Sequence, residues 1–399
     1  MFRAFVLSLL SLFAGAQASY AASQCVPVGN WVDTKSEEVI EAKKVLGKAE
    51  GAKVVLLGED HENAEHHRWQ LGMISQIYSR RQNIALGFEM FPREVQPILD
   101  DWVAGEISED QFLSQVKWHE IWNYDSDLYM PIFHFARMNR IPMFALNIPR
   151  EVVSMIGDKG WAELSPKMRE SIGEPAPPTS EFKEMMQQVF MQHMPHGQAQ
   201  EGEAPEIDQD KLSNFMYGQL AWDRAMAGSI KSILESDKFD SVVAIMGAGH
   251  IIPTTAVPYQ LSALKTKDVL SFMPWDDTMH CEEFSQSIAH FAFGVDKKTE
   301  RFAHGKSSKL RRVMLGVFLE KSEDGVLVSR VVDDSIAQSA GIEKDDIIVE
   351  IAGKKATEVE DVIRAVRKIA PGTWLPLTVK RMTKNIAMVA KFPPSPSDD

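Results

Sequence analysis

The stretch LLGEDHENAEHHRWQ, residues 56–70, joins a buried segment to a polar one. The segment AKVVLLGED (52–60) is typical of a buried strand, and AEHHRWQLGMISQIYSRR (64–81) has the apolar spacing of a helix. A strand, a short polar loop and a helix in this order are the first unit of an α/β fold. The stretch is either a ligand-binding or catalytic loop, or a polar helix start that happens to be rich in histidine.

The same alternation continues along the chain. Further strands are expected at 83–91, 141–149 and 239–251, and helical segments at 94–121, 129–140 and 214–234. This pattern indicates an α/β domain with a largely parallel sheet and helices on both faces. Between about 158 and 215 the sequence changes character and predicts a helical lid subdomain, part of which is rich in proline, glycine and polar residues.

Polar residues stand at the end of each expected strand. Gly58 to His61 follow the first strand and Gly247 to His250 the last, so two Gly-x-x-His stretches about 190 residues apart terminate apolar runs. Parallel sheets place their sites at the carboxyl ends of strands. With Glu89 on the second strand, the two histidines form a candidate set that either ligates a divalent metal or transfers protons.

Two more histidines, His66 and His67, fall in the first turns of the helix expected after the loop. Asn63 suits the N-cap position, and Glu62 and Glu65 favour the positive helix end. This arrangement predicts that His66 and His67 lie at the surface or at the rim of a pocket.

Composition excludes some partners. The chain has 43 Lys and Arg against 56 Asp and Glu, which leaves a net charge of −13. Nucleic-acid binding needs a concentrated basic face, so no nucleic-acid partner is expected.

The first residues decide the compartment. Residues 1–22 combine Arg3, an apolar stretch of about a dozen residues and small-x-small cleavage sites, which is typical of a secretory signal peptide. We therefore expect secretion to the periplasm. A lipid anchor on Cys25 is not favoured, because Ser23 and Gln24 fit the small-residue motif poorly. Cys25 and Cys281 either pair in an oxidising compartment or remain thiols.

A second module follows a basic linker at 301–312. Residues 313–392, which precede a tail at 393–399, resemble a PDZ domain of the bacterial protease-associated type. SAGIEKDDIIVEIAGKKA matches the family's glycine-then-strand signature, and VEDVIRAVRK matches the helix beside the peptide groove. The resemblance implies a small α+β domain that binds the C-termini of peptides or partner proteins. The carboxylate-binding loop then corresponds to Leu315, Gly316, Val317 and Phe318.

The first domain, residues 23–300, also resembles a known family. The blocks LLGEDHENAEHHRWQ, GFEMFPREVQPILDDW, WNYDSDLYMPIFHFARMNRIPMFALNIPRE, QLAWDRAMAGSI and GAGHIIPTTAVPYQL are similar to the ChaN-like haem-binding uptake family, related to the Tiki and TraB proteins. The resemblance implies a helix-covered sheet with a helical subdomain. It also implies haem or iron-complex binding in iron acquisition, and dimers. A homodimer and peripheral membrane association are compatible with this reading.

On the haem hypothesis, the protein supplies an axial ligand, an apolar slot and cations for the propionates. The candidate haem-binding residues lie in matching blocks or beside the lid: His61, Tyr124, Tyr129, Tyr217, His250, Arg68 and Arg150.

The Tiki resemblance implies a second hypothesis, a metal-dependent hydrolase. A metal such as Zn or Mn would be held by His61, His250 and Glu89, with Glu59 or Glu89 as the catalytic base. A weaker third idea is copper binding by MMQQVFMQHMPH (185–196), against which methionine packing along a lid helix is the stronger interpretation.

Overall fold

The computed structural model describes residues 25–193, 207–285, 287–296, 314–367, 369–370 and 372–394. The expected signal peptide and the linker lie outside these residues. Contacts divide the chain into two compact units, Met1–Phe302 and Ala303–Asp399.

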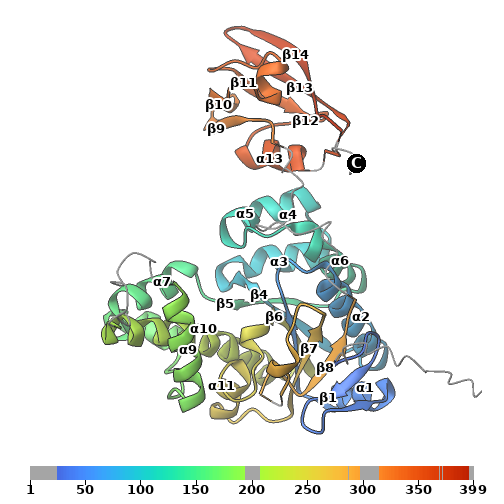
Figure 1. Ribbon diagram of the computed structural model, residues 1–399, viewed down its shortest axis with the longest axis vertical. Coiled ribbons are helices and arrows are strands. Elements are labelled where there is room, and N and C mark those ends of the chain that lie inside the picture. Colours follow the sequence, from blue (N-terminus) through green and yellow to red (C-terminus); the bar gives the residue numbers. More distant parts are fainter. Residues whose placement is uncertain are drawn as a thin grey trace, which may run out of the picture. The chain divides into compact units, whose positions relative to one another are not determined.

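The first unit is built on an eight-stranded sheet with the order β2-β1-β8-β7-β3-β6-β4-β5 (Figure 1). Strands β8, β7, β3, β6, β4 and β5 pair parallel with one another in this order, whereas β1 pairs antiparallel with both β2 and β8. The strands are β1 (Trp31–Asp33), β2 (Glu38–Ile40), β3 (Val54–Glu59), β4 (Ile84–Pro92), β5 (Met143–Asn147), β6 (Ser241–Gly247), β7 (Val269–Trp275) and β8 (Phe291–Gly294). The predicted α/β class and largely parallel sheet are confirmed.

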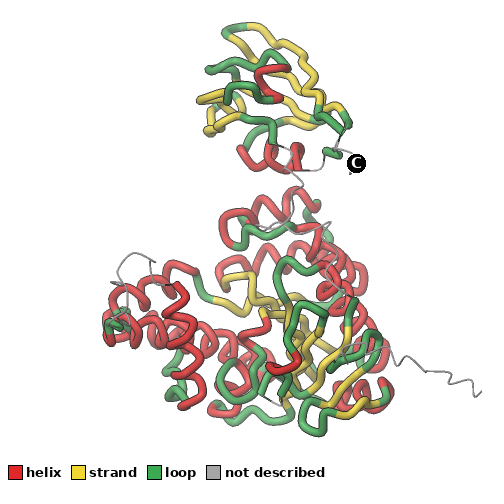
Figure 2. The backbone as a smooth tube through the Cα atoms, viewed as in Figure 1, coloured by secondary structure: helices red, strands yellow, loops and turns green. Residues whose placement is uncertain are grey.

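Helices cover both faces of this sheet (Figure 2). One group follows the first strands: α1 (Ala42–Gly51), α2 (Ala64–Arg80), η1 (Arg93–Val95), α3 (Gln96–Ala104), α4 (Glu109–Gln115), α5 (Trp118–Ile121) and α6 (Ser126–Asn139). The rest are α7 (Arg150–Lys159), η2 (Trp161–Glu163), α8 (Pro166–Ile172), α9 (Ser180–His193), α10 (Gln209–Glu235), η3 (Ala248–His250), α11 (Val257–Ala263) and η4 (Cys281–Glu283).

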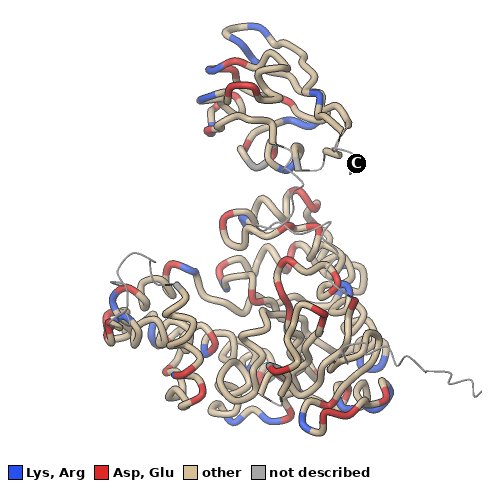
Figure 3. The backbone as a smooth tube through the Cα atoms, in the orientation of Figure 1, with Lys and Arg blue, Asp and Glu red and all other residues tan. Residues whose placement is uncertain are grey.

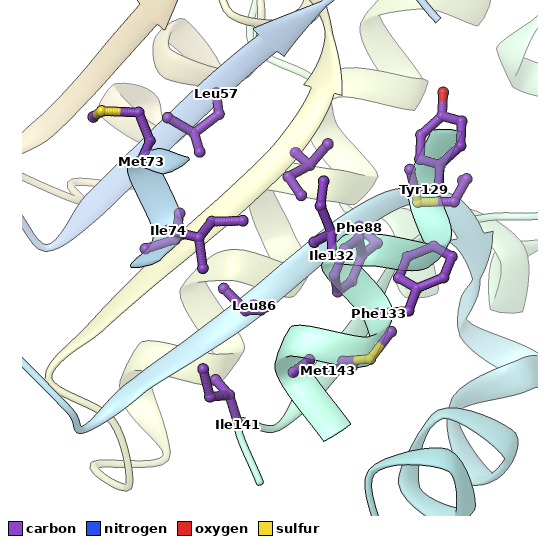
Figure 4. Packing of buried hydrophobic residues seen from close by; sticks show 14 of the residues in the cluster. Leu57, Met73, Ile74, Leu86, Phe88, Tyr129, Ile132, Phe133, Ile141 and Met143 are labelled. Atoms are coloured by element: carbon purple, nitrogen blue, oxygen red, sulfur yellow. The ribbon is translucent and has the colours of Figure 1, made fainter. Parts of the chain in front are cut away.

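The buried strands explain why two helical layers form. Val55 and Leu57 of β3 pack against the α1–α6 layer, whereas Val54 and Leu56 pack against α10 and α11. Successive side chains of a strand point to opposite faces, so an uninterrupted apolar run needs a cover on each side. Figure 4 shows part of the first core, where Phe88 of β4 meets Ile132 and Phe133 of α6.

The helical subdomain packs on α10. Ile156 of α7 and Ile172 of α8 share an apolar cluster with Ala221 and Ala225 of α10. Phe182 and Met186 of α9 form a second apolar cluster with Leu220 of α10. Figure 1 shows α7, α9 and α10 side by side. The subdomain therefore begins at Arg150, ahead of the expected start near 158.

The second unit is an antiparallel sheet with two short helices. Its order is β14-β13-β11-β10-β9, and β12 pairs with β11. The elements are β9 (Val317–Ser322), β10 (Gly325–Val331), α12 (Ile336–Ser339), β11 (Ile347–Ile351), β12 (Lys354–Lys355), α13 (Val359–Arg367), β13 (Trp374–Arg381) and β14 (Lys384–Lys391). The expected small α+β domain is confirmed.

Charged residues of both signs are interspersed along the described chain (Figure 3). Within these residues, no helix has the length and apolar character needed to cross a membrane.

Candidate functional site

The site lies where β3, β6 and β4 end side by side. The sheet order places β6 between the other two strands, with Glu59 in register with Gly247. The two Gly-x-x-His stretches and Glu89 therefore meet at the carboxyl ends of these neighbouring strands, as the strand-end argument predicted.

Glu59 is the centre of the first cluster. Its carboxylate is buried and accepts a hydrogen bond from the Tyr129 hydroxyl at 2.8 Å. Nδ1 of His61 lies 2.8 Å from Oε1, and Nδ1 of His67 lies 3.2 Å from Oε2. Burial alone would raise the pKa of Glu59, but the charge of His67 and the hydrogen bonds from both imidazoles outweigh it. The pKa falls well below its usual range, and Glu59 is a fixed anion.

His250 is the centre of the second cluster. Its Nδ1 lies 2.5 Å from Oδ1 of Asp223 on α10, and its Nε2 lies 3.3 Å from Oε1 of Glu89. All three side chains are buried. Burial would lower the pKa of His250, but the two carboxylates raise it well above its ordinary value. His250 is therefore a charged imidazolium held at both ring nitrogens.

Gly247 brings the two clusters together. Its backbone N–H donates to Oε2 of Glu89 at 2.6 Å. A Cβ on Gly247 would lie 2.9 Å from Cε1 of His61, 3.1 Å from its Nε2 and 3.6 Å from Oε2 of Glu89. Only a residue without a side chain lets the His61 ring approach the end of β6 this closely.

His61 forms the accessible part of the site, with its side chain 24% exposed. Its ring centroid lies 4.7 Å from that of Trp122 and 4.9 Å from that of Tyr124. Tyr124 is half-buried, in the turn before α6. Burial and the charges of Glu62 and Asp60 raise the pKa of Tyr124, while Arg150 opposes them. A phenol and an imidazole thus share one half-exposed aromatic surface.

Of the other predicted haem residues, Tyr129 belongs to the buried part of the site, whereas Tyr217 and Arg68 lie elsewhere. Tyr129 is fully buried, and its hydroxyl points away from the apolar cluster toward Glu59 (Figure 4). Tyr217 packs in the apolar cluster of α7 and α8. Arg68 pairs with Glu65 and lines a separate groove of about 400 Å³ with Trp31 and Trp69.

The prediction that His66 and His67 lie at the surface or a pocket rim is wrong. Both are buried, because His67 faces Glu59 and His66 faces Asp276. The sequence interpretation also missed Asp223. The sequence feature that could have indicated it is a single acidic residue on the apolar face of α10, close to Leu220 and Ala221.

Among the described residues, no group of three or more His, Cys, Asp or Glu is arranged to hold a metal ion. In the methionine-rich helix α9, Met186 is buried against Phe182 and Leu220, whereas Met191 is exposed. Met194 and His196 of the copper hypothesis lie outside the described residues.

In the second unit, β9 is an edge strand: among the described residues, it pairs with β10 alone. Leu315 is buried, and Gly316 adopts a φ of 84° with Ser335 only 2.3 Å from where its Cβ would lie. Val317 and Leu319 are half-buried on β9, and Lys321 pairs with Glu358 at the start of α13. Phe318 points outward under the Arg330 guanidinium.

Comparison with known proteins extends these observations. The model of a family described as haem-binding uptake, Tiki superfamily, ChaN, matches residues 45–261, more than half of the chain, and a PDZ model matches 313–390. No curated protein matches the chain.

Among solved structures, one described as cofacial heme binding to ChaN of Campylobacter jejuni shares the fold, with a TM-score of 0.52 and 17% identity. That match covers 66% of this chain and 95% of the other. The serine endoprotease from Yersinia pestis is 31% identical over 19% of this chain and 27% of its own, with a TM-score of 0.18. The HtrA3 PDZ domain bound to a phage-derived ligand is 23% identical over 20% of this chain and 82% of its own, with a TM-score of 0.18.

The paired Gly-x-x-His edge and the two family models lead to one assignment. The chain belongs to the ChaN haem-binding uptake family of the Tiki superfamily, and a PDZ domain follows the family domain.

Proposed function

We propose that the first unit binds haem or a related iron complex in the periplasm, with Tyr124 as the axial ligand. The observation that carries the proposal is the half-exposed pair of Tyr124 and His61 above the buried Glu59. Phenolate and imidazole are both established haem ligands.

The residues present fit such a group. Trp122 and Tyr124 supply aromatic surface next to His61, and Arg150 is an exposed cation whose charge is felt at the Tyr124 phenol. His250 does not suit an axial role, since carboxylates occupy both of its ring nitrogens. Tyr124 and His61 would hold the group, which would supply an iron centre when bound, and Glu59 keeps the His61 ring oriented.

Haemin titration of the mature protein tests this proposal. We expect a saturable Soret band that Tyr124→Phe removes. Tyr217→Phe is the matched control, because Tyr217 packs in the helical subdomain and should leave the titration unchanged. A wild-type protein without a saturable band, or a Tyr124→Phe variant that binds as wild type does, would contradict the proposal.

We also propose secretion without a lipid anchor. The Cys25–Cys281 disulfide supports an oxidising compartment, and it occupies the thiol that a lipid would need. Release of the mature chain by osmotic shock, without detergent, is the expected result. Detergent-dependent release would contradict the proposal.

The PDZ unit would recruit a partner through a free C-terminus. An extended peptide can add to the open edge of β9, with alternate side chains facing α13. The half-buried Val317 and Leu319 line that side, so apolar residues are favoured there. Binding of a peptide with a free C-terminus, and loss of binding when the same peptide is amidated, is the expected pair of results.

A metal-dependent hydrolase is the second candidate. One observation favours it: a carboxylate holds Nδ1 of both His61 and His250, as carboxylates do for metal-bound histidines. Elemental analysis and a peptidase assay of wild type and Glu89→Gln distinguish the candidates. Stoichiometric zinc or manganese, with a peptidase activity that Glu89→Gln abolishes, would favour the hydrolase.

A further inference from the structure

The connection between β7 and β8 reaches the His61 loop through Asp276. This carboxylate is buried. Its Oδ1 accepts hydrogen bonds from the backbone N–H of Thr278 at 2.9 Å and from the Thr278 hydroxyl at 2.5 Å. Its Oδ2 accepts from the Asn63 amide at 2.7 Å and lies 3.5 Å from Nε2 of His66. Oδ1 thus binds the turn that follows Asp276 in the chain, whereas Oδ2 contacts the segment after β3.

His66 also contacts the loop that contains His61. The backbone N–H of Asp60 donates to Nδ1 of His66 at 2.9 Å. Because Nδ1 accepts this bond, a neutral His66 carries its proton on Nε2, the nitrogen that faces Asp276. The buried His66 ring therefore lies between Asp60 and Asp276, hydrogen-bonded to the Asp60 backbone and 3.5 Å from the Asp276 carboxylate.

Asn63 fixes the other end of the loop. It is the N-cap of α2, and its side-chain oxygen accepts from the Glu65 backbone N–H at 3.0 Å while its amide donates to Asp276. One carboxylate from a distant strand connection thus contacts both ends of the loop from Asp60 to Asn63, by a hydrogen bond at Asn63 and by the close approach of His66 at Asp60. His61 lies between these two points.

Two features hold Asp276 in turn. Trp275, the residue before it, packs edge-on against Phe284 with ring centroids 5.2 Å apart. Cys281, between these two aromatic residues in the chain, forms a disulfide with Cys25 at a sequence separation of 256 residues. Met279 and Cys25 pack on the same apolar cluster as Trp275.

We propose that Asp276 is a positioning residue for His61, acting through His66 and Asn63, and that the Cys25–Cys281 disulfide keeps Asp276 in place. The geometry of the site then depends on a residue outside both Gly-x-x-His stretches and on the oxidation state of two cysteines. Where haem binding is the measurement, the inference rests on the proposed function.

Asp276→Asn is the sharpest variant, because it keeps the size of the side chain. One carboxylate oxygen becomes an NH₂ group, which cannot accept a hydrogen bond. In one orientation this NH₂ faces the Asn63 amide and His66, and in the other it faces the two donors of Thr278. Either choice breaks half of the set and loosens the loop.

The first measurement does not involve haem. Diethyl pyrocarbonate modifies accessible imidazoles, and in the native loop region His61 is partly exposed whereas His66 is fully buried. Peptide mapping by mass spectrometry then follows each histidine separately. We expect Asp276→Asn to expose His66 to modification and to change the His61 rate several-fold. Haemin affinity should fall several-fold, with a shifted Soret maximum.

Asp33→Asn is the matched control, because Asp33 also accepts backbone N–H bonds but serves the turn between β1 and β2. It should leave both histidine rates and haemin binding as in wild type. The disulfide is tested on the wild-type sequence by reduction and on the double variant Cys25→Ser/Cys281→Ser. Both should reproduce the Asp276→Asn changes in weaker form, even if Asp276→Asn itself folds poorly.

The possible outcomes test the role of Asp276, the role of the disulfide and the proposed haem binding separately. Unchanged histidine rates in Asp276→Asn would overturn the positioning role, and unchanged rates after reduction would overturn the role of the disulfide. If wild type binds no haemin, the proposed function fails while the histidine rates still decide the inference.

Discussion

At Gly247, the absence of a side chain makes room for the His61 ring. The His61 ring occupies the space where a Cβ would stand, and the Gly247 N–H holds Glu89. The φ of Gly247 is −55°, which any residue adopts, so the requirement is space alone.

Gly247→Ala should therefore displace His61 and leave the backbone intact. A Cβ at 2.9 Å from Cε1 of His61 forces the ring to move by several tenths of an ångström. We expect haemin affinity to fall by about tenfold, equivalent to about 1.4 kcal/mol, when measured by Soret titration.

Gly249→Ala is the control two residues away, since nothing lies within 4 Å of its Cβ position. Equal haemin affinities in Gly247→Ala, Gly249→Ala and wild type would show that the His61 position does not matter for binding.

Haem binding should depend on pH through Tyr124. Burial and nearby carboxylates raise the pKa of this phenol, so at neutral pH it carries a proton that iron must displace. Affinity should therefore increase with pH below that pKa, by at most about tenfold per pH unit for one released proton. Titrations between about pH 6 and 9 measure the slope. An affinity without this rise would point to a ligand that is already deprotonated.

Among the elements, η1 joins the helical subdomain to the sheet through Arg93. The guanidinium donates to the Ser229 hydroxyl at 2.8 Å, to the Ser171 carbonyl at 2.7 Å and to the Ala225 carbonyl. These partners belong to α10 and α8, so one side chain after β4 connects two helices of the subdomain.

Arg93→Ala should lower the free energy of unfolding of the first unit by about 2 kcal/mol, since bonds from a charged donor are lost and carbonyls lose their partner. Chemical denaturation gives the value, and limited proteolysis should show faster cleavage between α8 and α9. Arg80→Ala, which removes only a bond within α2, should leave both measurements near wild type.

Long, buried elements could be predicted from the sequence, whereas short ones could not. Strands β3, β4, β5 and β6 were expected because each is mostly apolar, whereas β1, β2 and β8 are three or four residues long, which is too short for a clear apolar pattern. Pro274 lies within β7 and obscures that strand. The helix expected from 214 begins at Gln209, because Asp208 caps it.

The site was only partly predictable for a related reason. Gly58 to His61 and Gly247 to His250 could be paired because both follow apolar runs. Asp223, His67 and Asp276 could not be placed, because their partners lie on other elements and only the packing of α10, α2 and β7 brings them together.

For the whole molecule, two separate cores imply two unfolding events. The first unit and the PDZ unit each have their own apolar clusters, with Ile245 fully buried in one and Ile348 in the other. Units with independent cores unfold independently unless they share a large interface.

Calorimetry of the intact chain should resolve two transitions. Ile348→Ala should lower only the PDZ transition and Ile245→Ala only the other, each by about 2–5 kcal/mol in stability. A single transition that both variants shift together would show that the units unfold as one.

The antiparallel position of β1 has a consequence for how the chain matures. Trp31 to Asp33 lie between β2 and β8, and the latter strand is formed by Phe291 to Gly294. During synthesis, β1 meets its neighbour β2 at once, but its other neighbour, β8, is the last described strand of the unit to be made. Such long-range closure is slow. An incomplete chain ending before β8 would present an unpaired edge, where association with other chains begins.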